Sequence, residues 1–143
     1  MISACARTVA FALFAAVAVA HTVTAQVAKD LKASDAWVRL PAAGETSTIA
    51  VASIANAGMY AIYLVSATSD VAGKVELRDA SKGPEPLSDV TVINYETAYM
   101  DPKGIHIYLG DLKRPLTEGE TVNITLKTDA GDRLEVAAVV KKP

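Results

Sequence analysis

The sequence predicts an all-β fold, an antiparallel sandwich or barrel, and three observations lead to that prediction. Short runs of β-branched and apolar residues recur at intervals of roughly ten residues. Gly, Pro, Asn and Asp separate these runs, as is typical of turns between antiparallel strands. Residues 26–143 show no sustained apolar period of 3.6 residues, which an amphipathic helix requires. A chain of 143 residues is large enough for one domain with a real core.

The first 25 residues are set apart from this domain. Arg7 is their only charge, and residues 9–20 form an apolar run that is too short to span a bilayer. A more polar stretch that ends in small residues follows. This layout predicts a secretory signal peptide over residues 1–25, a domain over residues 26–143, and therefore a periplasmic protein secreted through a cleaved signal.

The composition excludes several classes of function. Since Arg7 is the only charge in the predicted signal, the domain carries 13 Lys and Arg against 16 Asp and Glu, a formal net charge of −3. This balance argues against nucleic-acid binding. Cys5, the single cysteine, lies in the predicted signal and is not placed for lipid attachment. The domain therefore has no disulfide, no Cys-type zinc site and no cysteine nucleophile.

No enzyme is predicted either. The domain has no convincing catalytic triad and no phosphate-cradling loop, so no catalytic and no cofactor-binding residue is assigned. It also has no second apolar segment long enough to span a membrane once the signal is removed.

Three strands are predicted in the first part of the domain. Residues 36–40 form a strand that ends at Pro41, and residues 48–54 are β-branched and small. Residues 56–58 (Asn-Ala-Gly) supply a turn. Residues 60–67 are apolar almost throughout, which predicts a strand covered on both faces.

The middle of the domain begins with strict alternation of polar and apolar residues over 74–79. This alternation predicts a half-buried strand with Val75 and Leu77 facing inward and the polar residues facing outward. Residues 89–94 and 96–100 are predicted to form two short strands or one bent strand.

The last part holds three further strands. Residues 105–109 contain His106, the only histidine of the domain, and lead into a Gly-containing bend. Residues 121–128 alternate cleanly, and residues 129–132 form a hairpin turn into the closing strand, 134–140.

Several stretches, in their order and spacing, resemble the periplasmic copper chaperones that help to build the dinuclear copper centre of cytochrome c oxidase. They are Ala36-Trp37-Val38-Arg39 with Pro41, Asn56-x-Gly58, Leu64 to Ser69, Val75-Glu76-Leu77, Gly104-Ile105-His106-Ile107, and Gly110 to Gly119. The resemblance implies a cupredoxin-like β-sandwich. It also implies copper handling or oxidase assembly, with a copper-accepting partner such as an oxidase subunit.

Members of this family hold Cu(I) with two histidines and two methionines, which suits a soft ion. The first histidine follows Val-Glu-Leu, one methionine comes from the next loop, and a His-x-Met pair completes the set. Here the first histidine position is Arg78, which has no lone pair to give and a permanent positive charge. The methionine of His-x-Met is Tyr108, and residues 79–88 contain no methionine. His106 is thus the one metal candidate, and the sequence predicts a degenerate, weak Cu(I) site.

Alternatives remain open at this point. In one alternative, the protein is a metal-free β-sandwich that serves as a binding or assembly module. In another, Met59, Met100 and His106 combine into a substitute copper site. Cleavage after Ala20 instead of Ala25 would leave His21 at the N-terminus, where its amine and ring nitrogen together bind copper.

The residues around His106 also allow a local interpretation without a metal. His106 is then a half-buried polar residue that is hydrogen-bonded within the sheet. Arg78 and Tyr108 form a surface pair with the guanidinium over the phenol ring, or the three residues make a recognition patch for an anionic or protein partner.

Overall fold

The computed structural model describes residues 26–143, and every regular element in that range is a strand. The predicted signal peptide, with Cys5 and His21, lies outside the described residues. The strands are β1 (Leu31–Arg39), β2 (Thr48–Asn56), β3 (Ile62–Ser69), β4 (Ala72–Asp79), β5 (Val90–Val92), β6 (Thr97–Tyr99), β7 (Ile105–Leu112), β8 (Thr121–Thr128) and β9 (Arg133–Lys141).

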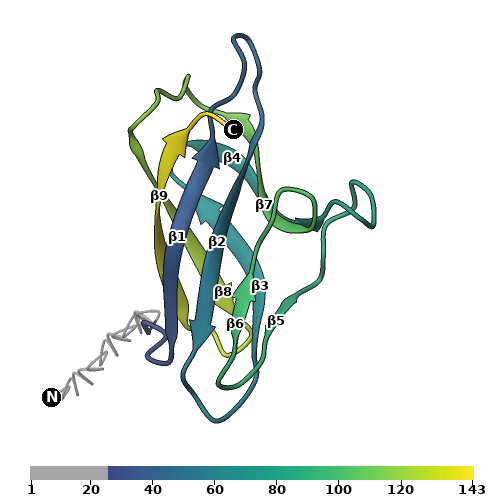
Figure 1. Cartoon of the computed structure of the whole chain (residues 1–143), viewed down its shortest axis with the longest axis vertical. Helices are drawn as coiled ribbons and strands as arrows, with labels where there is room; N and C mark the ends of the chain where they lie inside the picture. Colours follow the sequence, from purple (N-terminus) through teal and green to yellow (C-terminus); the bar gives the residue numbers. More distant parts are fainter. Residues whose placement is uncertain (1–25) are drawn as a thin grey trace, which may run out of the picture.

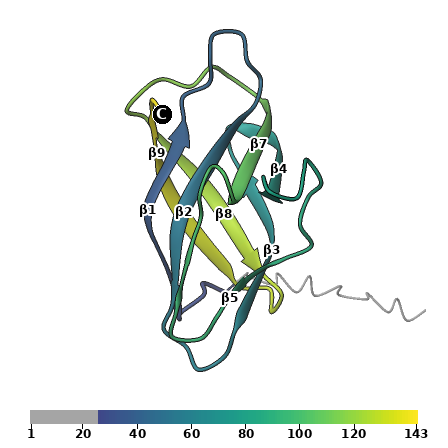
Figure 2. The ribbon, with the colours of Figure 1, turned by 45° about the vertical axis from the view of Figure 1, so that its right-hand side comes forward.

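The strands form one sheet in the order β4-β7-β2-β1-β9-β8-β3-β5, and β6 pairs with β2. The sheet bends over on itself so that β3 comes to lie against β4. Figures 1 and 2 show the result, with β9, β1 and β2 in one layer and β8 and β3 behind them. The predicted all-β sandwich is confirmed.

The sheet is not wholly antiparallel, which corrects the prediction. β1 and β9 run parallel, with Trp37 opposite Val139. A parallel pair needs a long crossover connection. The rest of the domain supplies it here, because the first and last strands close the sandwich side by side.

β1 and β7 extend furthest beyond their predicted bounds, and each contains a residue with positive φ that bends the strand without ending it. β1 begins at Leu31, and Asp35, with a φ of 50°, lies at the bulge between Ser34 and Trp37. β7 continues through Asp111, which has a φ of 49°, to the end of its pairing with β4. The bulge in β1 interrupts the side-chain alternation on which the sequence pattern relies, whereas the pairing of β7 with β4 keeps its register through Asp111.

β3 was predicted to be covered on both faces, and this is wrong. Leu64 and Ala67 are buried, whereas Tyr63 and Val65 are exposed. Because β3 belongs to a sheet with a core on one side only, its other face meets solvent although its residues are apolar.

The core lies between the two layers and follows the alternation of the strands. In β8 and β9, every second residue is buried, from Val122 to Thr128 and from Leu134 to Val140. Ile107 and Leu109 of β7 and Leu77 of β4 face the same interior. The residues between them on β4 and β7 therefore face outward, and the candidate site is built on that outer face.

Candidate functional site

The pairing of β4 with β7 brings the predicted site residues together. Arg78 lies opposite His106, and Glu76 lies opposite Tyr108. Directly opposed residues of an antiparallel pair have their Cβ atoms about 5 Å apart on the same face. Arg78 also forms a bridge with Pro86 on its other side. The positions that resemble the family's ligand positions are thus neighbours on one outer face.

His106 is held by the turn that leads into its own strand. Its side chain is buried, and Nδ1 lies 2.9 Å from the carbonyl oxygen of Gly104. Because a carbonyl can only accept, Nδ1 carries the proton and the neutral ring keeps the lone pair on Nε2. A metal-ligating histidine commonly has this arrangement, with one nitrogen fixed by a backbone carbonyl and the other free to ligate. The prediction of a half-buried histidine hydrogen-bonded within the sheet is met only in part, because the ring is buried and its partner belongs to the turn that precedes β7.

Arg78 stacks on Tyr108, as the sequence predicted. The guanidinium carbon lies 3.6 Å from the centroid of the phenol ring. The pair is not a surface pair, however, because the Arg78 side chain is only 17 % exposed. A cation–π contact with this degree of desolvation stabilises the fold by about 1–2 kcal/mol.

Glu76 completes the cluster by pairing with the same arginine. Nε of Arg78 donates to Oε2 of Glu76 at 2.8 Å, and the terminal nitrogen lies 2.6 Å from the same oxygen. Nζ of Lys74 lies 3.4 Å from the other carboxylate oxygen. The hydrogen bond from Arg78 is the main cause that lowers the pKa of Glu76 below its ordinary value of 4.5. The charge of Arg78 is therefore neutralised within the protein.

This ion pair predicts a dependence of stability on pH. Since the pKa of Glu76 is lower in the folded state, its contribution is present above pH 4.5 and is lost as the pH falls through the folded value. We expect Glu76→Gln to be less stable than wild type at pH 7, and the difference to vanish under acid conditions. Thermal unfolding between pH 7 and pH 2 measures this. A difference that persists at pH 2 would contradict the pairing, and Glu135→Gln, at an exposed position, serves as the control.

Gly110 is a part of the site that the sequence pattern did not reveal. It follows Tyr108 on the same face of β7, and the phenol ring lies over it. A Cβ atom at residue 110 would stand 2.7 Å from Cε1 of Tyr108 and 3.2 Å from Cζ. The absence of a side chain at Gly110 therefore allows the ring to lie flat beneath Arg78.

Replacing Gly110 by alanine is expected to displace the Tyr108 ring and to lower the free energy of unfolding by about 1 kcal/mol through loss of the stacking. Chemical denaturation and the ring NMR signals of Tyr108 check this. Gly104→Ala is the matched control, because a Cβ atom there would meet nothing closer than 4.0 Å. Equal stability of the two variants, with unchanged ring signals, would contradict the packing described.

Asp79 orders the start of the loop beside the site. Its Oδ1 accepts hydrogen bonds from the backbone and hydroxyl of Ser81, at 3.0 and 2.6 Å. These bonds are the largest cause that lowers the pKa of Asp79, and smaller contributions come from Lys82 and His106.

Residues 26–143 contain no group of three or more His, Cys, Asp or Glu side chains placed to hold a metal ion.

The substitute set of methionines is not brought together. The backbone N–H of Met100 donates to the carbonyl of Ala52, so Met100 lies near the start of β7. Met59 is exposed in the turn beyond Asn56. Asn56 itself is four residues, or roughly 13 Å, further along β2 than Ala52. Met59 and His106 therefore do not face one another.

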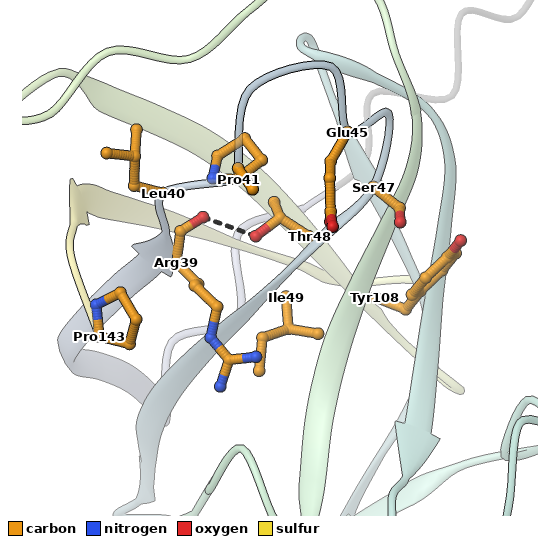
Figure 3. A pocket seen from close by; sticks show the side chains of 10 residues that line it. Arg39, Leu40, Pro41, Glu45, Ser47, Thr48, Ile49, Tyr108 and Pro143 are labelled. Carbon is orange, nitrogen blue, oxygen red and sulfur yellow. Dashed lines mark hydrogen bonds between the residues drawn. The ribbon is translucent and has the colours of Figure 1, made fainter.

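A cavity of about 430 Å³ lies next to Tyr108, which forms part of its lining (Figure 3). It is lined by Arg39 of β1, Ile49 of β2 and the loop between these strands, and the Thr48 hydroxyl donates to the Arg39 carbonyl. Nε of Arg39 is the one buried side-chain nitrogen or oxygen in the described part of the chain without a hydrogen-bond partner. An acceptor atom of water or of a ligand would satisfy it.

The fold, a small β-sandwich, is similar to that of solved PCuAC domains. The copper-bound PCuAC domain from PmoF2 has a TM-score of 0.70 to this structure at 21 % identity, covering 80 % of this chain and 94 % of that one. The apo PCuAC domain from PmoF1 gives 0.72 at 24 % identity, with 80 % and 95 % covered. These two matches show the fold.

The chain belongs to the family described as "Putative lipoprotein LpqE-like", whose model matches residues 31–140. A protein of Leifsonia xyli subsp. xyli named "Putative lipoprotein Lxx21020" is 32 % identical over 120 residues, which are 80 % of this chain and 71 % of that protein. The solution structure of Cu(I)-DR1885 from Deinococcus radiodurans is 33 % identical with a TM-score of 0.67, covering 86 % and 85 %. The resemblance to copper chaperones is confirmed at the level of the fold.

Proposed function

We propose that this chain is an extracytoplasmic, copper-chaperone-like protein that acts in copper handling or cytochrome oxidase assembly through a degenerate Cu(I) site. One observation supports the proposal. Arg78 lies opposite His106 with Tyr108 beside it, so the three positions that the sequence resemblance matches to copper ligands are neighbours on one face of the sheet. The solved structures that share the fold include copper-bound forms, which supports a role with copper as the cargo.

The donor set does not fit a two-histidine, two-methionine site. His106 offers one imidazole nitrogen, the guanidinium of Arg78 offers none, and a neutral phenol such as Tyr108 is a hard, weak ligand for a soft ion. The Arg78 side chain is moreover held by Glu76 and Tyr108, so a copper ion at His106 would have to displace these contacts to move the guanidinium from the site. Cu(I) bound at His106 would need its remaining ligands from a partner or from small molecules.

Location outside the cytoplasm is supported by the sequence and by the family. The layout of residues 1–25 is that of an export signal, and the family description names lipoproteins. In residues 26–143 no helix is long and apolar enough to cross a membrane. We propose that cleavage follows Ala25 and that a copper-accepting protein, such as an oxidase subunit, is the partner.

A competition titration of Cu(I) against a chelator tests the degenerate site. We expect wild type to yield its copper to chelators of modest affinity, and His106→Ala to bind less still. Met59→Ala is the control, because Met59 lies away from His106 and should not matter. Tight one-to-one binding by wild type that His106→Ala abolishes would overturn the proposal.

A second candidate is a metal-free binding or assembly module, and one observation favours it. The Arg78 cluster is complete without a metal, since its cation is both paired with Glu76 and stacked on Tyr108. In that case His106→Ala should leave the very weak copper binding of wild type unchanged. The same titration therefore separates the two candidates.

A further inference from the structure

Aromatic side chains gather at one end of the sandwich. Four of the five tyrosines of the chain are exposed, and six of the nine exposed large apolar or aromatic side chains of residues 26–143 come from the segments 59–63 and 93–99. We call these six the aromatic rim: Met59, Tyr60, Tyr63, Ile93, Tyr95 and Tyr99. Tyr60, Tyr95 and Tyr99 are 79 %, 68 % and 77 % exposed. Large exposed tyrosines in such a concentration are typical of interaction surfaces.

Asn56 fixes the two segments of the rim side by side. Its buried Nδ2 donates both to the carbonyl of Tyr60 at 2.8 Å and to that of Val92 at 3.1 Å. Its backbone N–H donates to the carbonyl of Glu96. Figures 1 and 2 show the turn after β2 and the turn after β5 together at the end of the sandwich away from residues 40–47. The hydrogen bonds of Asn56 therefore fix the positions of the two segments that form the aromatic rim.

The two flanks of the rim belong to different layers. Tyr63 lies opposite Thr91 in the β3–β5 pair, and Tyr99 lies opposite Ser53 in the β2–β6 pair. The chain passes from β5 to β6 through Tyr95, which has a φ of 59°. A bulky residue in this conformation costs free energy, and such strain gathers at functional sites.

The charge around the rim is mainly negative. Lys29 lies beside Ala61 and Ile62, but Asp30, Asp129 and Asp132 line the same pocket. Residues 40–73 and 83–102 contain no lysine or arginine, whereas Asp89, Glu96 and Asp101 accompany the rim tyrosines along the second segment. Glu96 and Asp89 are exposed. Lysine and arginine side chains find two favourable partners on such a surface, the aromatic faces and the carboxylates. An anionic membrane or nucleic acid would be repelled.

We propose that the aromatic rim docks a basic polypeptide segment of a partner protein, with lysine or arginine side chains on the tyrosine faces. This surface lies outside the His106 site and goes beyond the copper-handling function. Tyr60 and Tyr95 supply the large, rigid contacts that dominate binding energy at interfaces. Asp89 and Glu96 select the sign of the partner's charge.

NMR titration of the copper-free protein with a synthetic hexa-arginine peptide tests the proposal. We expect shift changes confined to residues 56–63 and 89–100, and affinity at least tenfold weaker in Tyr60→Ala/Tyr95→Ala. Val139→Ala is the matched control, since Val139 is 44 % exposed on β9, and it should bind as wild type does. Asp89→Asn/Glu96→Gln should weaken binding and flatten its dependence on salt.

Other results would overturn the docking proposal. Shift changes spread over all acidic residues, equal binding of hexaglutamate, or undiminished binding by the tyrosine variant would each do so. Self-association that Tyr60→Ala/Tyr95→Ala abolishes would assign the rim to a second copy, and binding to phosphatidylglycerol vesicles through the rim would assign it to a membrane. Because no copper is used, failure here leaves the copper titration of His106 unaffected.

Discussion

Replacing Asn56 by alanine is expected to lower the free energy of unfolding by about 3 kcal/mol, a large share of the stability of a domain of this size. The side chain of Asn56 is 2 % exposed and makes three hydrogen bonds. It donates to the carbonyls of Tyr60 and Val92, and its Oδ1 accepts from the N–H of Gly58 at 2.9 Å. Alanine would leave three backbone groups without partners, and each costs about 1 kcal/mol or more when it is kept from water.

Urea denaturation of wild type and variant measures this loss. Asn123→Ala is the control, because Asn123 is exposed on β8, and we expect a change within about 0.5 kcal/mol there. A loss below about 1 kcal/mol in Asn56→Ala would contradict the view that this one side chain holds the two turns together. Asn56→Asp keeps the acceptor for Gly58 but loses the donor, so its free energy of unfolding should be close to that of the alanine variant.

The triple variant Arg78→His/Pro86→Met/Tyr108→Met is expected to bind Cu(I) at least about a hundredfold more tightly than wild type, or about 2.7 kcal/mol. Pro86 is the place for the loop methionine because it forms a bridge with Arg78 and so faces the same side. The variant would surround His106 with a second imidazole and two thioethers, which are the ligands that Cu(I) prefers. It also removes the guanidinium charge.

The chelator titration described for His106→Ala measures the gain. The matched control carries the same three substitutions with His106→Ala, and should lose most of the gained affinity. A folded triple variant with the affinity of wild type would show that the residues have been matched wrongly to the ligand positions. Circular dichroism establishes folding, since the variant also loses the Arg78–Tyr108 contact.

Much of the fold followed from local patterns. The alternation over residues 74–79 and 121–128 set which side chains face the core, and the positions of β4 and β8 agree with it. The contact of Arg78 with Tyr108 was also foreseen, because the family resemblance matches both residues to ligand positions of one site.

Other features depend on contacts that no local pattern encodes. The bulge at Asp35 was missed because alternation is lost there, and the continuation of β7 through Asp111 was missed because positive φ is unusual inside a strand. The exposed face of β3 was misjudged because apolar composition does not show how many layers cover a strand. The role of Gly110 depends on where one ring lies, and that of Asn56 on two turns separated by some thirty residues.

The most direct test of the degenerate site is X-ray absorption at the copper edge of the wild-type protein loaded with less than one equivalent of Cu(I). We predict coordination by nitrogen and oxygen, with one imidazole from His106 and no sulfur, because Met59 is exposed in the turn beyond β2 and Met100 packs against the core. Two sulfur ligands at the copper ion would contradict it.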